Sequence, residues 1–175
     1  MLYENNLYDI VKSYFGDNLY ITGSVALRMI LYTAGYDDLL ETLSNPNDID
    51  FLYTGRQTEE CRITRIGSYV NPKEPHRSVT FVCENTENCD YNTFDLTMVP
   101  SVKHIVIDGI NVIDPRSLLK YYQDDDINEN TRVNVEALKE AIKRVEQDDE
   151  LSQRLFYRPK QTHRKDFGSL SRALF

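Results

Sequence analysis

Three aspartates in this sequence have the spacing and the neighbours of metal ligands on adjacent strands. Asp48 and Asp50 are one residue apart, in a segment that alternates polar and apolar side chains as a half-buried strand does. Side chains two apart on a strand point to the same face, so these two carboxylates project together and repel each other. A hard divalent cation turns such repulsion into ligation. Asp95 has apolar neighbours on both sides, and we expect an adjacent antiparallel strand to present it to the same ion.

Three acidic ligands suit two Mg²⁺ ions, or two Mn²⁺ ions in their place. Two such ions about 3.5–4 Å apart can activate an attacking hydroxyl and steady a leaving pyrophosphate. Asp95 can also accept the proton of that hydroxyl. We therefore expect Asp48, Asp50 and Asp95 to be both the metal ligands and the catalytic residues.

A Gly-Ser pair upstream of the aspartates is the candidate phosphate-binding site. Gly23 ends a short β-branched and aromatic run, residues 19–22, and lets the backbone approach a phosphate without a Cβ in the way. Ser24 can cap the helix that follows, where the helix dipole favours an anion. Arg28 on that helix and Lys120 on a later one can reach triphosphate oxygens, although a lone basic residue on a helix is ordinarily at the surface. We expect all four residues to bind nucleotide.

The elements that must position these residues form an α+β pattern. Helices are expected over residues 5–15, from Val25 onward, around 35–43, over 115–122 and over 131–147. Strands are expected over 19–22, 48–53, 61–66, 78–83, 92–99, 105–107 and 111–113, with Asp108-Gly109 as a hairpin turn. The sequence thus predicts a mixed, mostly antiparallel sheet flanked by helices. We expect one domain over 1–156, with a core at 19–114 and C-terminal helices at 115–156, followed by a basic tail at 157–175.

Composition narrows the classes of partner. The chain has 175 residues, of which 41% are hydrophobic, and this can supply a core. Its net charge is −8, but the tail carries five basic residues against one acidic residue, so the rest of the chain has a net charge of −12. A surface this acidic repels phosphates and argues against extended duplex DNA as a partner. The odd number of cysteines, three, without a C-x-x-C spacing favours a reducing compartment. No stretch approaches the about 20 apolar residues that span a bilayer, so we expect a cytoplasmic protein that does not bind membranes.

Three segments together resemble the signature of a known family. Ile21-Thr22-Gly23-Ser24, Asn47-Asp48-Ile49-Asp50-Phe51 and Phe94-Asp95-Leu96 look like the three elements of the polymerase-beta-type nucleotidyltransferase superfamily. The resemblance implies the nucleotidyltransferase fold, two-metal transfer of NMP from an NTP, and ligand roles for the three aspartates. Twenty-three residues separate Ser24 from Asp48, about twice the gap of many members, and the Gly23-Ser24-Val25-Ala26-Leu27 start resembles a minimal or abortive-infection toxin type of nucleotidyltransferase.

The sequence therefore predicts a metal-dependent nucleotidyltransferase that moves NMP from an NTP onto a hydroxyl. It leaves the acceptor open among RNA, protein and small molecules, and it leaves open which NTP is used and the oligomeric state. The alternative is a catalytically inactive protein that keeps the fold as a binding or scaffolding module, since a fold does not guarantee its chemistry.

Overall fold

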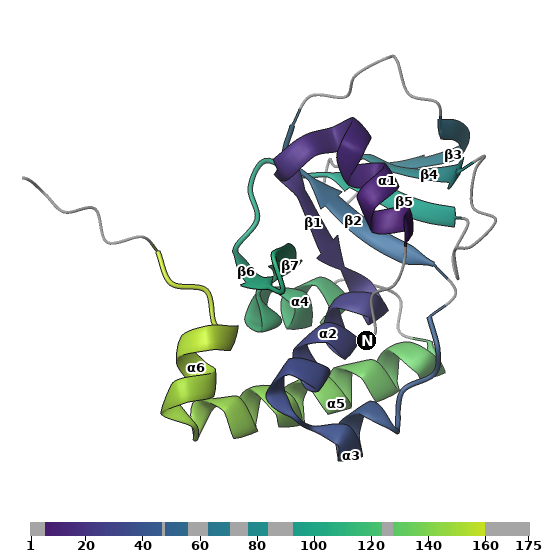
Figure 1. The fold of residues 1–175 in the computed structure, drawn as a ribbon. Coiled ribbons are helices and arrows are strands. Elements are labelled where there is room, and N and C mark those ends of the chain that lie inside the picture. The colour runs from purple at the N-terminus through teal and green to yellow at the C-terminus, as the bar shows by residue number, and fades with distance from the viewer. Residues whose placement is uncertain are drawn as a thin grey trace, which may run out of the picture.

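The computed structural model of this protein is an α+β fold built on one mixed sheet flanked by helices (Figure 1). It describes residues 6–46, 48–55, 63–70, 77–83, 93–123 and 128–159, and for residues 6–7, 63–70, 77–83 and 93 it describes the backbone alone. Within these ranges, every helix is too short or too polar to traverse a bilayer. The predicted fold class is confirmed.

In the described part of the chain, seven strands form the sheet. They are β1 (Leu19–Thr22), β2 (Ile49–Tyr53), β3 (Ile63–Val70), β4 (Arg77–Cys83), β5 (Thr93–Met98), β6 (His104–Ile107) and β7 (Ile110–Ile113). Their order across the sheet is β3-β4-β5-β2-β1-β7-β6. The pairs β2–β5 and β1–β7 are parallel, and the other four pairs are antiparallel, which matches the mostly antiparallel mixed sheet expected from the sequence.

The helices lie before, between and after the strands. They are α1 (Asn6–Phe15), α2 (Gly23–Ala34), α3 (Asp37–Leu40), α4 (Pro115–Gln123), α5 (Glu129–Glu146) and α6 (Asp149–Leu155), with a short 3-10 helix at Gly16–Asn18. The sequence did not predict α6, because seven residues give too short a periodic pattern. Its start is nevertheless set by a side chain, since Asp148 accepts a hydrogen bond of 3.0 Å from the backbone N–H of Leu151.

Aromatic packing covers one face of the central strands. From α1, Phe15 packs edge-on against Tyr53 and Phe94, at ring-centroid distances of 5.2 and 6.5 Å. Phe51 meets Phe94 at 5.7 Å, so neighbouring strands β2 and β5 share this apolar layer. Because strand side chains alternate between faces, filling this face with Phe51 and Phe94 sends Asp50 to the opposite face.

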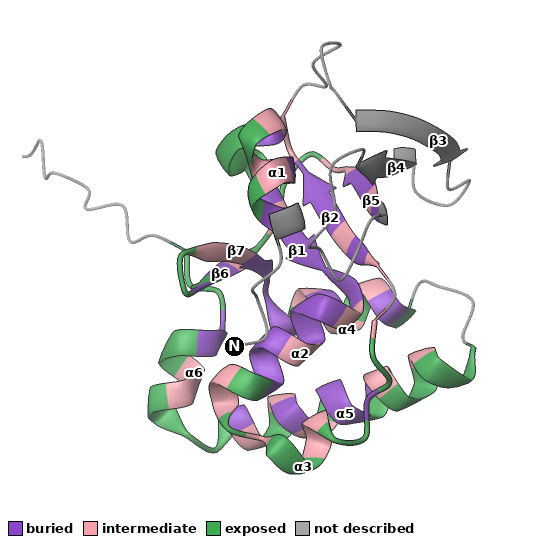
Figure 2. Cartoon of the chain, turned by 45° about the vertical axis from the view of Figure 1, so that its right-hand side comes forward, coloured by how far each residue is buried: buried purple, intermediate pink, exposed green. Residues whose placement is uncertain are grey.

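A second buried layer is formed by α2, α4 and α5 (Figure 2). Met29 of α2, Leu118 of α4 and Leu138 of α5 are fully buried in it. At its edge the Arg144 guanidinium of α5 makes a fork of two hydrogen bonds, 2.9 and 2.8 Å, with the carboxylate of Asp38 in α3. This fork fixes α3, and α3 lies in the long segment between the Gly-Ser pair and the paired aspartates.

A buried carboxylate ties the end of the described chain to the sheet. Asp114 caps α4, accepting hydrogen bonds from the backbone N–H groups of Arg116 and Ser117 at 3.1 Å each. Its other oxygen accepts from the N–H of Tyr157 at 2.6 Å. The Arg116 guanidinium also lies 3.8 Å from the ring centroid of Phe156. Residues 160–175 of the basic tail lie outside the described residues, and the domain division stays a prediction.

Candidate metal and nucleotide site

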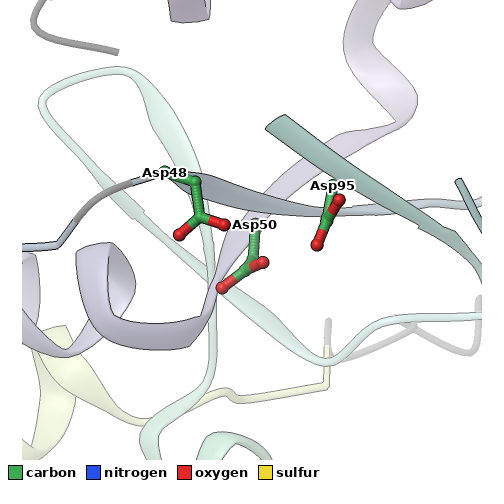
Figure 3. A group of neighbouring side chains, drawn as sticks. All are labelled: Asp48, Asp50 and Asp95. Carbon is green, nitrogen blue, oxygen red and sulfur yellow. The ribbon is translucent and has the colours of Figure 1, made fainter. Parts of the chain in front are cut away.

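The structure brings the three aspartates together at one place on the sheet. One carboxylate oxygen from each of Asp48, Asp50 and Asp95 lies within 4.8 Å of the other two. Asp48 stands one residue before β2, Asp50 is in β2, and Asp95 is in β5. Figure 3 shows their carboxylates on the same side of these two strands. Oxygens at this separation can share a cation, and all three side chains are partly buried.

The strand that presents Asp95 is parallel to β2, so the expectation of an antiparallel neighbour was wrong. Asp50 stands directly opposite Asp95 in the parallel β2–β5 register. The reason is topological: β3 and β4 come between β2 and β5 in the sequence, β4 is antiparallel to both β3 and β5, and β3 runs in the same direction as β2. The chain therefore enters β5 in the direction of β2. Directly opposed residues share a face in either kind of pairing, and so the carboxylates still meet.

The electrostatics of the cluster favour a bound cation. Burial, and then the nearby charge of Asp95, raises the pKa of Asp48 above its ordinary value of 3.8. The Oδ1 atom of Asp95 is buried and has no hydrogen-bond partner in the described part of the chain. A buried acceptor without a partner is costly, and a positive ion would satisfy it. The donor set, oxygens from three carboxylates, is the one that Mg²⁺ and Mn²⁺ prefer, so these residues fit such an ion.

Gly23 lies in direct contact with this cluster. Its φ of +66° is in the left-handed region that glycine favours. A Cβ built on Gly23 would overlap the Oδ2 atom of Asp50 and would lie 3.0 Å from its Cγ. The bend after β1 therefore requires glycine at position 23 for two reasons: the positive φ, and the lack of room for a Cβ beside Asp50. The predicted phosphate-binding site at Gly23 therefore lies next to the predicted metal-binding site at the three aspartates.

Ser24 does not cap α2, contrary to the expectation. The cap position is Thr22, whose side chain makes no capping hydrogen bond, and Gly23 already begins the helix. Ser24 is thus a partly buried residue of the first turn. The glycine's left-handed angle explains the shift, because it turns the chain into the helix two residues earlier than the capping pattern suggested. A phosphate role for Ser24 stays a prediction.

The two basic candidates have different surroundings. The Nη1 atom of Arg28 donates to the carbonyl oxygens of Leu43 and Ser44, at 3.4 and 3.3 Å. Arg28 therefore fastens the segment that leads to Asp48. Lys120 is exposed in the last turn of α4. Nucleotide binding by either residue stays a prediction.

One residue at this site was missed by the sequence reasoning. Thr22 is 1% exposed, ends β1 and stands directly opposite Asp50 in the antiparallel β1–β2 register. Its Oγ1 atom has no hydrogen-bond partner among the described residues. The one sequence signal was its position immediately before Gly23, at the end of a strand.

Comparison with known proteins supports the fold. No protein-family model matches the sequence, and no curated protein matches it. Among solved structures, the chain is similar to the Megavirus polyadenylate synthase, with a TM-score of 0.50 and 18% sequence identity over 81% of this chain and 32% of that one. It also matches JHP933 from Helicobacter pylori, with a TM-score of 0.40 and 14% identity over 85% of this chain and 75% of that one. The chain spans about a third of the viral synthase. The first of these similarities identifies the fold as nucleotidyltransferase-like.

Proposed function

We propose that this protein is a metal-dependent nucleotidyltransferase that transfers NMP from an NTP to a hydroxyl group of an acceptor. One observation carries the proposal: carboxylate oxygens of Asp48, Asp50 and Asp95 lie within 4.8 Å of one another, beside the bend at Gly23. The nucleotidyltransferase-like fold shared with a polyadenylate synthase supports the same class of reaction. RNA, protein and small molecules are all open as the acceptor.

The site residues have two kinds of role: most bind the cations or the phosphates, and one also accepts a proton. Asp48, Asp50 and Asp95 would hold one or two divalent cations, which supply positive charge against the triphosphate and the leaving pyrophosphate. The α2 N-terminus at Gly23 and Ser24 presents backbone N–H groups and the positive end of the helix dipole to the phosphates. The bend brings these groups next to Asp50, so a bound triphosphate would lie beside the residues that would hold the cation.

The bond changes are those of an in-line displacement. The acceptor oxygen forms a bond to the α-phosphorus as the bond from that phosphorus to the pyrophosphate oxygen breaks. The hydroxyl proton passes to the Asp95 carboxylate. The products are the nucleotidylated acceptor and pyrophosphate.

The test is a transfer assay with α-labelled NTPs. Each of the four NTPs is incubated with the full chain, with Mg²⁺ or Mn²⁺, and with separate pools of RNA, protein and small-molecule acceptors. We expect label to appear in one pool, and we expect Asp48→Asn and Asp50→Asn to abolish it, since loss of a catalytic group costs several powers of ten in rate.

Asp108→Asn is the matched control. Asp108 is exposed in the β6–β7 turn with a φ of +50°, a conformation that asparagine tolerates, so this variant loses one carboxylate away from the cluster. It should keep full activity. If no pool is labelled under any condition, while the protein retains a stable partner in pull-downs, the scaffolding alternative replaces the enzyme.

A further inference from the structure

The central strands carry a polar row that extends the aspartate cluster by one residue. Thr22 stands opposite Asp50 in the β1–β2 register, and Asp50 stands opposite Asp95 in the β2–β5 register. Directly opposed residues on paired strands point to the same face, with Cβ atoms about 4.5–5.5 Å apart in an antiparallel pair. Thr22, Asp50 and Asp95 therefore line one face of three adjacent strands.

Both ends of this row carry buried oxygens without partners. Thr22 Oγ1 and Asp95 Oδ1 are the buried side-chain atoms that have no hydrogen bond in the described part of the protein. Thr22 is almost fully buried, at 1% exposure, yet it leaves its hydroxyl unused even though it occupies the cap position of α2. A buried hydroxyl without a partner destabilises a protein unless something else satisfies it.

We infer that Thr22 is a positioning residue for the divalent cation, and that its hydroxyl takes a hydrogen bond from the ion's first hydration shell. This inference rests on the proposed function, because it needs an ion at the three aspartates. Mg²⁺ loses its water reluctantly and usually keeps several molecules when it binds to carboxylates. A neutral hydroxyl at the end of the carboxylate row can hold such a water without adding to the negative charge.

A valine at this position gives a test that separates ligand positioning from a structural role. Thr22→Val keeps the branched shape and removes the hydroxyl, so the metal-free protein should melt at the same temperature or higher, because an unsatisfied polar group is lost. Mg²⁺ affinity, measured by calorimetry on the full chain, should fall about tenfold or more, as for other residues that support metal ligands. Thr22→Ser keeps the hydroxyl and should keep close to wild-type affinity.

Thr97→Val is the matched control. Thr97 is also a buried threonine, two residues after Asp95 in β5, and it stands opposite Leu52 and not opposite an aspartate. The same chemical change there should leave Mg²⁺ affinity unchanged. If wild-type protein binds Mg²⁺ and Thr22→Val binds it equally well, or if Thr22→Val lowers the melting temperature of the metal-free protein, the inference is overturned. If wild-type protein binds no Mg²⁺, the proposed function fails with it.

Discussion

The contact between Gly23 and Asp50 predicts that an alanine at Gly23 is unusually costly. Two effects add. An L-residue at a φ of +66° costs about 1–2 kcal/mol. The new Cβ also overlaps Asp50 Oδ2, and forcing extra atoms into a packed site costs about 1–3 kcal/mol more. We therefore expect Gly23→Ala to lower the free energy of unfolding by about 2–5 kcal/mol.

Gly35 separates the two effects, because it has nearly the same backbone angle and no crowding. Its φ is +72°, and a Cβ built there meets nothing within 4 Å. Gly35→Ala should thus cost the backbone strain alone, about 1–2 kcal/mol. Both variants restrict the unfolded chain equally, so that contribution cancels when they are compared. The difference between them measures the overlap with Asp50.

Urea unfolding of both glycine variants, with and without Asp50→Ala, completes the test. Asp50→Ala removes Oδ2 and Cγ and leaves only its Cβ, 3.2 Å from the new methyl group. The extra cost of Gly23→Ala should then largely disappear, giving a coupling energy of about 1–3 kcal/mol. If Gly23→Ala costs no more than Gly35→Ala, or if its cost is the same with alanine at position 50, a Cβ at Gly23 does not collide with the Asp50 carboxylate.

Three further predictions concern charge and hydrogen bonding. The pKa of Asp48 is raised above 3.8, so the contribution of Asp48 to stability is present below that pH and is lost as the pH rises through the folded-state pKa. Urea titrations of the metal-free protein should therefore show Asp48→Asn becoming more stable relative to wild type as the pH rises above about 4, and a pH-independent difference would contradict this. Asp114→Ala should cost about 2–4 kcal/mol, because α4 loses its cap and the backbone N–H of Tyr157 loses its acceptor, while Asp114→Asn, which keeps one carbonyl oxygen, should cost less. Arg28→Ala should cost about 1 kcal/mol in the same assay and speed proteolysis between Leu43 and Asp48, and unchanged proteolysis would show that its long hydrogen bonds do not hold this segment.

Local chemistry made much of the site predictable from the sequence. Side chains alternate between the two faces of β2, and the apolar Phe51 belongs to the core. The sequence therefore places the neighbouring Asp50 on the opposite face. Gly23 after a short strand marked the bend, and Asp108-Gly109 marked a hairpin whose two positive φ angles, 50° and 78°, the structure confirms. These features depend on a few neighbouring residues. The proximity of the three carboxylates followed from them, while their roles stay predictions.

The features that were missed depend on contacts between distant segments. The direction of β5 depends on how β3 and β4, which precede it, pair within the sheet, and no local pattern around Asp95 carries that information. Likewise, Thr22 reads as an ordinary strand residue until the register places it opposite Asp50. Arg28 bonds to carbonyls fifteen and sixteen residues away, so its anchoring role is invisible from helix periodicity alone.

The most direct measurement is anomalous diffraction from crystals of the full chain soaked with Mn²⁺ and a non-hydrolysable NTP. We predict a manganese peak within coordination distance of oxygens from Asp48, Asp50 and Asp95, with the triphosphate beside Gly23, and no such peak in Asp50→Asn crystals. Well-occupied nucleotide with no manganese at these carboxylates, or manganese bound elsewhere, would contradict the account.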